Sequence, residues 1–187
     1  KFEPMGDIVV KSSALKGTIV KKEEIPSVID ELPILMVAAS LAKGRTIFEG
    51  VSELRVKETD RIRSMSRNLK KMGASITVFS ATSRGGSAKF ATKSGESTKH
   101  FGGKTSGSER IVIRGIKQLK ATRVRSFGDH RTAMSMIVAG LAASGKASID
   151  DISCINKSFP NFISLLDTLM NRRLTERSDV SRRQSRL

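Results

Sequence analysis

The sequence predicts an α/β fold in which one strand and helix unit occurs twice. Helical patterns alternate with short runs of β-branched residues along most of the chain. Residues 36–42 (MVAASLA) and 136–142 (MIVAGLA) match at four of seven positions and lie 100 positions apart, and each precedes a glycine, a predicted strand, a loop and a further helix. Two copies of one unit indicate a quasi-symmetric domain whose equivalent loops meet at one rim. A chance likeness between two Ala-rich helices is the alternative.

The first predicted elements lie in residues 18–50. The run Thr18–Val20 predicts a short strand, and the polar residues 21–27 predict a connection. Dense apolar positions in Asp30–Ala42 predict a buried helix with Asp30 at or near its N-cap and a glycine just past its end. Residues 46–50 then predict a strand.

The central region contains a second helix and strand. Apolar residues between Lys57 and Met72 recur at spacings of three, four and three, which predicts an amphipathic helix. Ser75–Phe79 alternates polar and apolar residues, as a half-buried strand does. Residues 80–108 are rich in Ser, Gly, Thr and Lys, and we expect a flexible loop there.

The last third of the chain repeats the pattern. It predicts a strand at Arg110–Arg114, a helix at Asp129–Ala143, a short strand at Ala147–Asp150 and a fourth helix from near Ser158. Residues 171–187 contain six arginines against two acidic residues, so we expect a basic, disordered tail.

Composition narrows the class of protein but does not choose a function. A hydrophobic fraction of 38% with 28% charged residues is typical of a soluble globular protein, and no apolar run reaches the roughly 20 residues of a membrane span. The single cysteine fits a reducing cytoplasm. A net charge of +16 indicates anionic partners: nucleic acid, anionic lipid, or phosphorylated and carboxylated small molecules.

The segment 55–61 (RVKETDR) is the first candidate site. It places three cations and two carboxylates at a predicted helix start, where free N–H groups and the helix dipole attract anions. Lys57 and Arg61, one turn apart, would form a pocket for phosphate or carboxylate, and Glu58 beside it could transfer protons. A solvated helix terminus with locally paired charges is the alternative.

A second candidate site opens the predicted helix at Asp129. Asp129 is a natural N-cap, whereas His130 and Arg131 put positive charge where the helix dipole opposes it unless an anion binds there. Asp30 is an N-cap first and a candidate base second. His130 could equally be structural, and Lys157 taken alone would be a surface lysine. The histidines and the cysteine stand apart in the sequence, which predicts no metal site.

Four segments resemble one family, the EPSP synthases (3-phosphoshikimate 1-carboxyvinyltransferases). They are IDELPIL at 29–35, LRVKETDR at 54–61, GDHRTAM at 128–134 and KSFP at 157–160, in the order and spacing of that family. The resemblance covers roughly residues 8–79 and 110–170. It implies repeated βαβαββ units within one domain of the inside-out α/β barrel enolpyruvyl transferase fold. Residues 1–170 would be part of the C-terminal domain, with 80–108 inserted.

The resemblance also implies a reaction. The family transfers the enolpyruvyl group of phosphoenolpyruvate to the 5-hydroxyl of shikimate 3-phosphate, releases phosphate, and needs no metal or organic cofactor. By position, Asp30 matches the carboxylate that contacts shikimate 3-phosphate and accepts the hydroxyl proton. Lys57 matches a residue that touches both substrates, and Glu58 matches the group that protonates the methylene of phosphoenolpyruvate.

The remaining matched positions are mostly cations. The groups that hold the carboxylate and phosphate of phosphoenolpyruvate correspond to Arg61, Arg131 and Lys157, and His130 lies beside them in a supporting role. The family's Lys-Ser substrate loop and its glycine-rich N-terminal loop are not in this sequence. We therefore expect activity only with a missing N-terminal portion, and apolar surface exposed where that portion would pack.

Two other functions are weighed against this one. UDP-N-acetylglucosamine enolpyruvyl transferases share the fold but do not carry the segment 55–61 in this form. A non-catalytic basic protein could instead bind nucleic acid or other polyanions through the Arg-rich tail, with affinity that falls steeply as salt rises. Since Trp and Tyr are absent and no recognition motif is present, we do not expect nucleic acid binding.

Overall fold

The computed structural model describes residues 6–7, 9–79 and 109–171. The predicted loop at 80–108 and residues 172–187 of the predicted tail lie outside this range.

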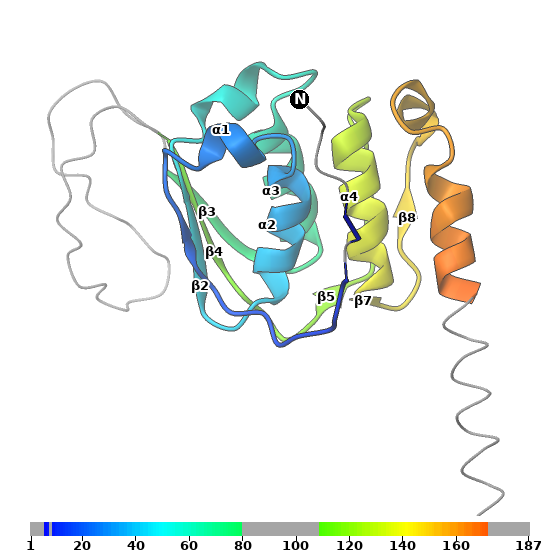
Figure 1. Ribbon diagram of the computed structural model, residues 1–187, viewed down its shortest axis with the longest axis horizontal. Helices are drawn as coiled ribbons and strands as arrows, with labels where there is room; N and C mark the ends of the chain where they lie inside the picture. The colour runs from blue at the N-terminus through cyan, green and yellow to red at the C-terminus, as the bar shows by residue number, and fades with distance from the viewer. Residues whose placement is uncertain (1–5, 8, 80–108, 172–187) are drawn as a thin grey trace, which may run out of the picture.

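A four-stranded sheet forms one side of the molecule (Figure 1). Strand β1 (Ile19–Val20) runs parallel to β2 (Arg45–Glu49), and β4 (Arg110–Arg114) pairs antiparallel with both β2 and β3 (Ser75–Phe79). Alternate residues of β2 and β4 are buried, and in β3 Ile76 is buried between the exposed Ser75 and Thr77, as predicted for a half-buried strand at Ser75–Phe79.

Two helices cover the buried face of the sheet, and a third packs on them. Helices α2 (Leu32–Leu41) and α3 (Arg61–Lys71) pack against the sheet, and α4 (His130–Leu141) lies next to α2 on the side away from the sheet (Figure 1). The predicted apolar stripe of α3 is buried, with Met65 and Leu69 fully inaccessible to solvent. The core therefore lies between the sheet and these helices.

The order β1, α2, β2, α3, β3, β4 is one complete βαβαββ unit. A second unit begins with β6 (Arg123–Val124), α4 and β8 (Ser148–Ile149), followed by helical residues 162–171. In both units the strands that flank the first helix pair in parallel. The pairing of β5 (Leu119–Lys120) with β7 (Ala143–Ser144) also has a counterpart, the bridge between Lys16 and Lys43. The predicted repeat is thus confirmed.

Three predicted boundaries were wrong. Residues 21–27 were expected to be irregular, but α1 (Ile25–Val28) begins there, with its proline in the first turn, where proline is tolerated. The helix expected from Lys57 begins at Arg61, because Asp60 caps it by accepting a hydrogen bond from the Arg63 amide at 2.9 Å. A 3₁₀ helix, η1 (Ser52–Val56), precedes it.

The fourth helix also starts later than expected. The 3₁₀ helix η2 (Ser153–Lys157) comes first, and α-helical structure begins at residue 162, after Pro160. The residue before a proline is biased away from the α-helical region, which delays the helix.

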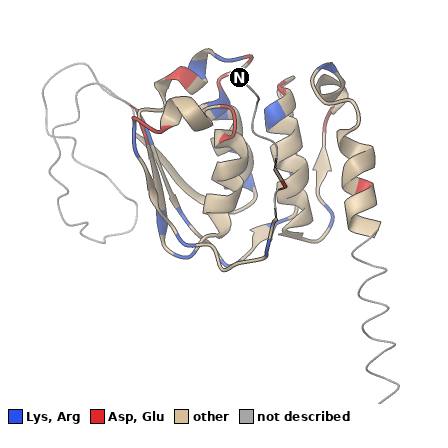
Figure 2. Cartoon of the chain, viewed as in Figure 1, with Lys and Arg blue, Asp and Glu red and all other residues tan. Residues whose placement is uncertain are grey.

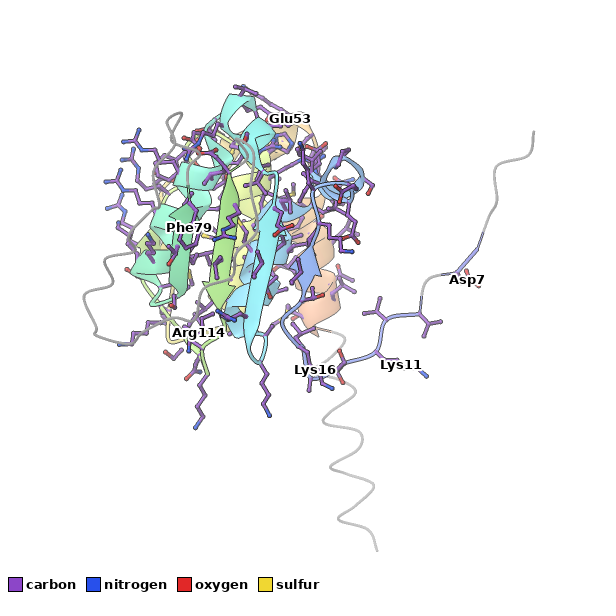
Figure 3. All side chains as sticks on the ribbon, turned by 90° about the vertical axis from the view of Figure 1, so that its left-hand side faces the viewer. Asp7, Lys11, Lys16, Glu53, Phe79 and Arg114 are labelled. Carbon is purple, nitrogen blue, oxygen red and sulfur yellow. The ribbon has the colours of Figure 1, made fainter. Side chains whose placement is uncertain are left out.

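Apolar side chains are exposed at both ends of the described chain. Val9 and Val10 are 78% and 88% exposed, on a segment that leads away from the body between the labelled Asp7 and Lys11 (Figure 3). Leu165 and Leu169 are exposed on the C-terminal helix. That these side chains pack against a missing N-terminal portion stays a prediction. No helix in the described part is long and apolar enough to cross a membrane.

Candidate active site

The N-terminal ends of α2, α3 and α4 lie at one end of the molecule (Figure 1). Both βαβ units send their helices in the same direction, so the loops before the helices meet at this rim. Acidic and basic residues lie on the ribbon at this end (Figure 2). Ion pairs join side chains from all three loops, which are far apart in sequence: Asp30, Glu58, Arg61, Asp129 and Arg131.

Arg61 is the centre of this cluster. Its side chain is only 1% exposed, and each of its three guanidinium nitrogens bonds a different carboxylate. Nε donates to Oδ2 of Asp129 at 2.8 Å, Nη1 donates to Oδ1 of Asp30 at 3.1 Å, and Nη2 donates to Glu58. The first residue of α3 therefore ties together the loops before α2, α3 and α4.

These partners keep Arg61 charged although it is buried. Burial alone would lower the pKa of a guanidinium, because it penalises the charged form. The hydrogen bond and charge of Asp129, the charge of Glu58 and the hydrogen bond of Asp30 outweigh that effect and raise the pKa of Arg61 above its ordinary value. A buried ion of this kind is tolerated only while its partners remain in place.

Asp129 has two tasks, one for each carboxylate oxygen. While Oδ2 accepts from Arg61, Oδ1 accepts from the Thr132 amide at 2.8 Å and so caps α4. The side chain is fully buried. The predicted N-cap is confirmed, and His130 and Arg131 occupy the first turn as predicted.

Asp30 connects the two arginines. Its Oδ2 lies 3.2 Å from Nη2 of Arg131, and its backbone carbonyl accepts from Nη1 of Arg131 at 2.9 Å. Glu31, not Asp30, is the N-cap residue of α2, and it makes no side-chain capping bond. The prediction of a capping role for Asp30 was wrong, because its carboxylate is turned to Arg61 and Arg131 instead.

A second ion network supports the loop before α3. Nε of Arg55 donates to Oε2 of Glu109 at 2.7 Å, and Nη1 donates to Oδ2 of Asp60 at 2.7 Å. The hydrogen bond to Glu109 is the main cause that raises the pKa of Arg55, although burial opposes it. Glu109 was missed at the sequence level, because it lies 54 positions from Arg55 and no local pattern connects the two.

The two predicted lysines have equivalent positions. Lys57 is the C-cap residue of η1 and Lys157 is the last residue of η2. Lys57 lies outside α3, so its predicted place one helical turn from Arg61 was wrong. Its Nζ bonds Oε1 of Glu53 at 2.7 Å instead.

Three predicted site residues remain apart from the cluster in this structure. They are Lys57, His130 and Lys157. Within the described residues, no hydrogen bond or ion pair joins any of them to Arg61 or to its carboxylate partners.

The chemistry that the cluster can perform follows from its exposure. The side chains of Asp30 and Glu58 are 44% and 52% exposed, so both carboxylates can exchange protons with a molecule bound at the rim. Arg131 is 31% exposed and can meet an anion directly, whereas an anion can reach Arg61 only by displacing one of its carboxylates. Among the described residues, no three His, Cys, Asp or Glu side chains are grouped to hold a metal ion.

The fold and the cluster together define an α/β domain of the enolpyruvyl transferase type. The family model of EPSP synthase (3-phosphoshikimate 1-carboxyvinyltransferase) matches residues 1–166, and the chain belongs to this family. A 3-phosphoshikimate 1-carboxyvinyltransferase of Geobacter sulfurreducens is 43% identical over 165 residues, which cover 88% of this chain and 32% of that protein. The one from Petrotoga mobilis is 41% identical over 167 residues, covering 89% and 32%.

Solved structures agree with this assignment. An EPSP synthase structure from Acinetobacter baumannii matches with a TM-score of 0.62 and 32% sequence identity, covering 83% of this chain and 30% of that chain. The present chain spans about a third of the length of the curated relatives it matches.

Proposed function

We propose that this chain supplies part of the active site of a 3-phosphoshikimate 1-carboxyvinyltransferase. Such an enzyme transfers the enolpyruvyl group of phosphoenolpyruvate to the 5-hydroxyl of shikimate 3-phosphate and releases phosphate. The observation that carries the proposal is the meeting of Asp30, Glu58, Arg61 and Arg131 at one rim from three separate loops. Membership of the EPSP synthase family supports it.

The reaction requires both a base and an acid. The 5-oxygen bonds the enol carbon of phosphoenolpyruvate while a proton is added to the methylene carbon. The hydroxyl proton must go to a base, which we assign to Asp30, and the methylene proton must come from an acid, which we assign to Glu58. Loss of that proton and of phosphate from the adduct then restores the double bond. The partial exposure of both carboxylates leaves them accessible to bound substrates.

Cations are needed because both substrates are anions that must approach each other. We assign binding of phosphoenolpyruvate to Arg61, Arg131 and Lys157, and contact with both substrates to Lys57. Arginine suits carboxylate and phosphate, because its planar fork donates two parallel hydrogen bonds. At Arg61 the incoming anion would replace Glu58, which this structure holds through Nη2. Displacement would also free Glu58 to act on the substrate, and His130 would support the bound anion from the first turn of α4.

The rest of the site would come from outside this chain. The matched relatives are about three times longer, so we propose that an N-terminal portion supplies the groups that bind the phosphate of shikimate 3-phosphate. A cytoplasmic location belongs to the same proposal, since the substrates are metabolites and the single cysteine suits a reducing compartment.

Phosphate release from shikimate 3-phosphate and phosphoenolpyruvate tests the proposal. The chain would be assayed alone and mixed with the N-terminal segment of a related EPSP synthase. We expect activity only in the mixture, and a loss of roughly 10²–10⁴-fold in Glu58→Gln, as for removal of one acid–base group. Glu23→Gln is the matched control, because Glu23 is exposed and makes no ion pair with Arg61 or Arg131 within the described residues. Equal activity of Glu58→Gln and Glu23→Gln in an active mixture would refute the assignment of Glu58.

A further inference from the structure

The buried side chain of Asn68 holds the segment that leads into α4. Its Nδ2 donates to the Arg125 carbonyl at 2.7 Å, and its Oδ1 accepts from the Arg125 amide at 3.0 Å. Asn68 is only 1% exposed and lies in the interior of α3, where asparagine is a poor helix former. Helix stability therefore does not account for an asparagine at this position, whereas two well-aligned bonds to one residue 57 positions away do.

Asn68 belongs to a polar stripe on one face of α3. Arg61, Ser64 and Asn68 follow at spacings of three and four, so they share this face, and all three are at most 2% exposed. Each bonds the segment 125–132, and the respective partners are Asp129, Thr132 and Arg125. The start of α4 is thus fixed to α3 at three points by hydrogen bonds rather than by apolar packing alone.

The turn between these points has an unusual backbone. Phe127 has φ 56° and Gly128 has φ 71°, so two successive residues lie in the left-handed region. For a bulky residue such as Phe127 this conformation is unfavourable and persists only where the surroundings impose it. Asn68 holds the residue before the turn and Arg61 holds the residue after it. A strained turn anchored on both sides gives α4 a defined starting position.

We propose that Asn68 is a positioning residue for the first turn of α4. By binding both backbone groups of Arg125, it fixes the turn at 126–128 and thereby the direction in which His130 and Arg131 face the rim. It does not itself touch a substrate. Its effect on catalysis rests on the proposed function, whereas its effect on the geometry of α4 does not.

Two variants of Asn68 and a control on the same helix separate the effect on the geometry of α4 from the effect on catalysis. Asn68→Asp keeps the acceptor for the Arg125 amide but places a carboxylate against the Arg125 carbonyl, and Asn68→Leu removes both bonds at similar size. Ser66→Ala is the control, because Ser66 is buried on α3 and its hydroxyl has no hydrogen-bond partner in the described structure. In NMR spectra of the isotope-labelled chain, we expect the Arg125 amide to exchange about tenfold faster or more in both Asn68 variants.

The decisive signals are those of the first turn. The His130 ring and Arg131 side-chain resonances should shift in the Asn68 variants and stay unchanged in Ser66→Ala. A folded Asn68→Asp chain with unmoved His130 and Arg131 signals would overturn the proposal. So would loss of folding in both Asn68 variants, because it would leave Asn68 a purely structural role.

Kinetics of the complemented enzyme add a second readout. Asn68→Asp should lower kcat/KM for phosphoenolpyruvate by up to about 10²-fold, the effect of a displacement near 1 Å, while KM for shikimate 3-phosphate changes much less. Equal kinetics in Asn68→Asp and Ser66→Ala would refute the link to catalysis. If the unmodified mixture is inactive, the proposed function fails, and the NMR comparison still decides whether Asn68 positions the turn.

Discussion

Replacement of Asp129 by asparagine tests whether the buried arginine centre holds the rim together. Asparagine is as good an N-cap as aspartate, so its Oδ1 can still accept the Thr132 amide. Its Nδ2, however, would face Nε of Arg61, and two donors would meet where an ion pair stood at 2.8 Å. The change therefore removes the charge partner while it keeps the size of the side chain and the cap.

The expected cost follows from the burial of the pair. Asp129 is 0% and Arg61 is 1% exposed, and removal of one partner of a buried pair costs about 3–5 kcal/mol. Arg61 keeps Asp30 and Glu58, which are partly exposed, so we expect the lower end, about 3 kcal/mol. Asp129→Ala should cost about 1 kcal/mol more, because the cap is lost as well.

Urea unfolding followed by circular dichroism measures this difference. The matched control is Glu53→Gln, which breaks the more exposed ion pair with Lys57. The N–O distance of that pair is 2.7 Å, close to the 2.8 Å of Arg61 and Asp129. Its loss should lower the unfolding free energy by less than about 1 kcal/mol. If Asp129→Asn proves no more costly than Glu53→Gln, Arg61 does not depend on Asp129, and the argument for a buried centre is refuted.

Three further predictions concern other parts of the fold. A Cβ at Gly115 would collide with the backbone of Ala42, so Gly115→Ala should lower the unfolding free energy by about 1–3 kcal/mol, more than Gly6→Ala, where no atom lies within 4 Å of the added Cβ. For Asp150, burial opposes ionisation, but hydrogen bonds from Ser126 and Asp151 lower the pKa below 3.8. The stabilisation that ionised Asp150 gives the fold should be complete above pH 3.8 and vanish as pH falls through the lowered pKa. The unfolding free energies of Asp150→Asn and of the unchanged chain should therefore converge in acid. Leu169 is 62% exposed, and Leu169→Lys should reduce self-association in sedimentation velocity, whereas an unchanged mass distribution would exclude this surface as the cause.

Periodicity explains which elements could be predicted. Helices α2, α3 and α4 and strands β3 and β4 are long enough to show an apolar pattern, and all five were found within a few residues. Strands β1 and β8 have two residues each and were predicted from short β-branched runs, whereas β5, β6 and β7, of the same length, were not predicted and are defined by their tertiary pairing. The 3₁₀ helices η1 and η2 have five residues each, less than two turns of an α-helix, and because they were missed, the two helices that follow them were predicted to start too early.

The candidate site was predictable in its residues but not in its contacts. Local motifs singled out Asp30, Glu58, Arg61 and Arg131, which the structure brings together. The pairing of Arg61 with Asp129 spans 68 positions and depends on how two helices pack, which no local pattern contains. Side-chain direction was equally hidden, and for that reason Lys57 was expected beside Arg61 but is paired with Glu53.

At the rim, carboxylates outnumber the arginines that they pair with. The chain carries a net charge of +16, yet in the cluster Arg61 and Arg131 face four carboxylates, those of Asp30, Glu31, Glu58 and Asp129. A substrate anion at Arg61 gains only the difference between its own interaction and that of the carboxylate it replaces. On the proposed function, the net affinity for a substrate anion would come mainly from the partly exposed Arg131, from Lys57, whose partner Glu53 is exposed, and from Lys157. Arg61 ties together the loops before three helices, and on the proposed function a substrate anion would bind it only after Glu58 had moved away.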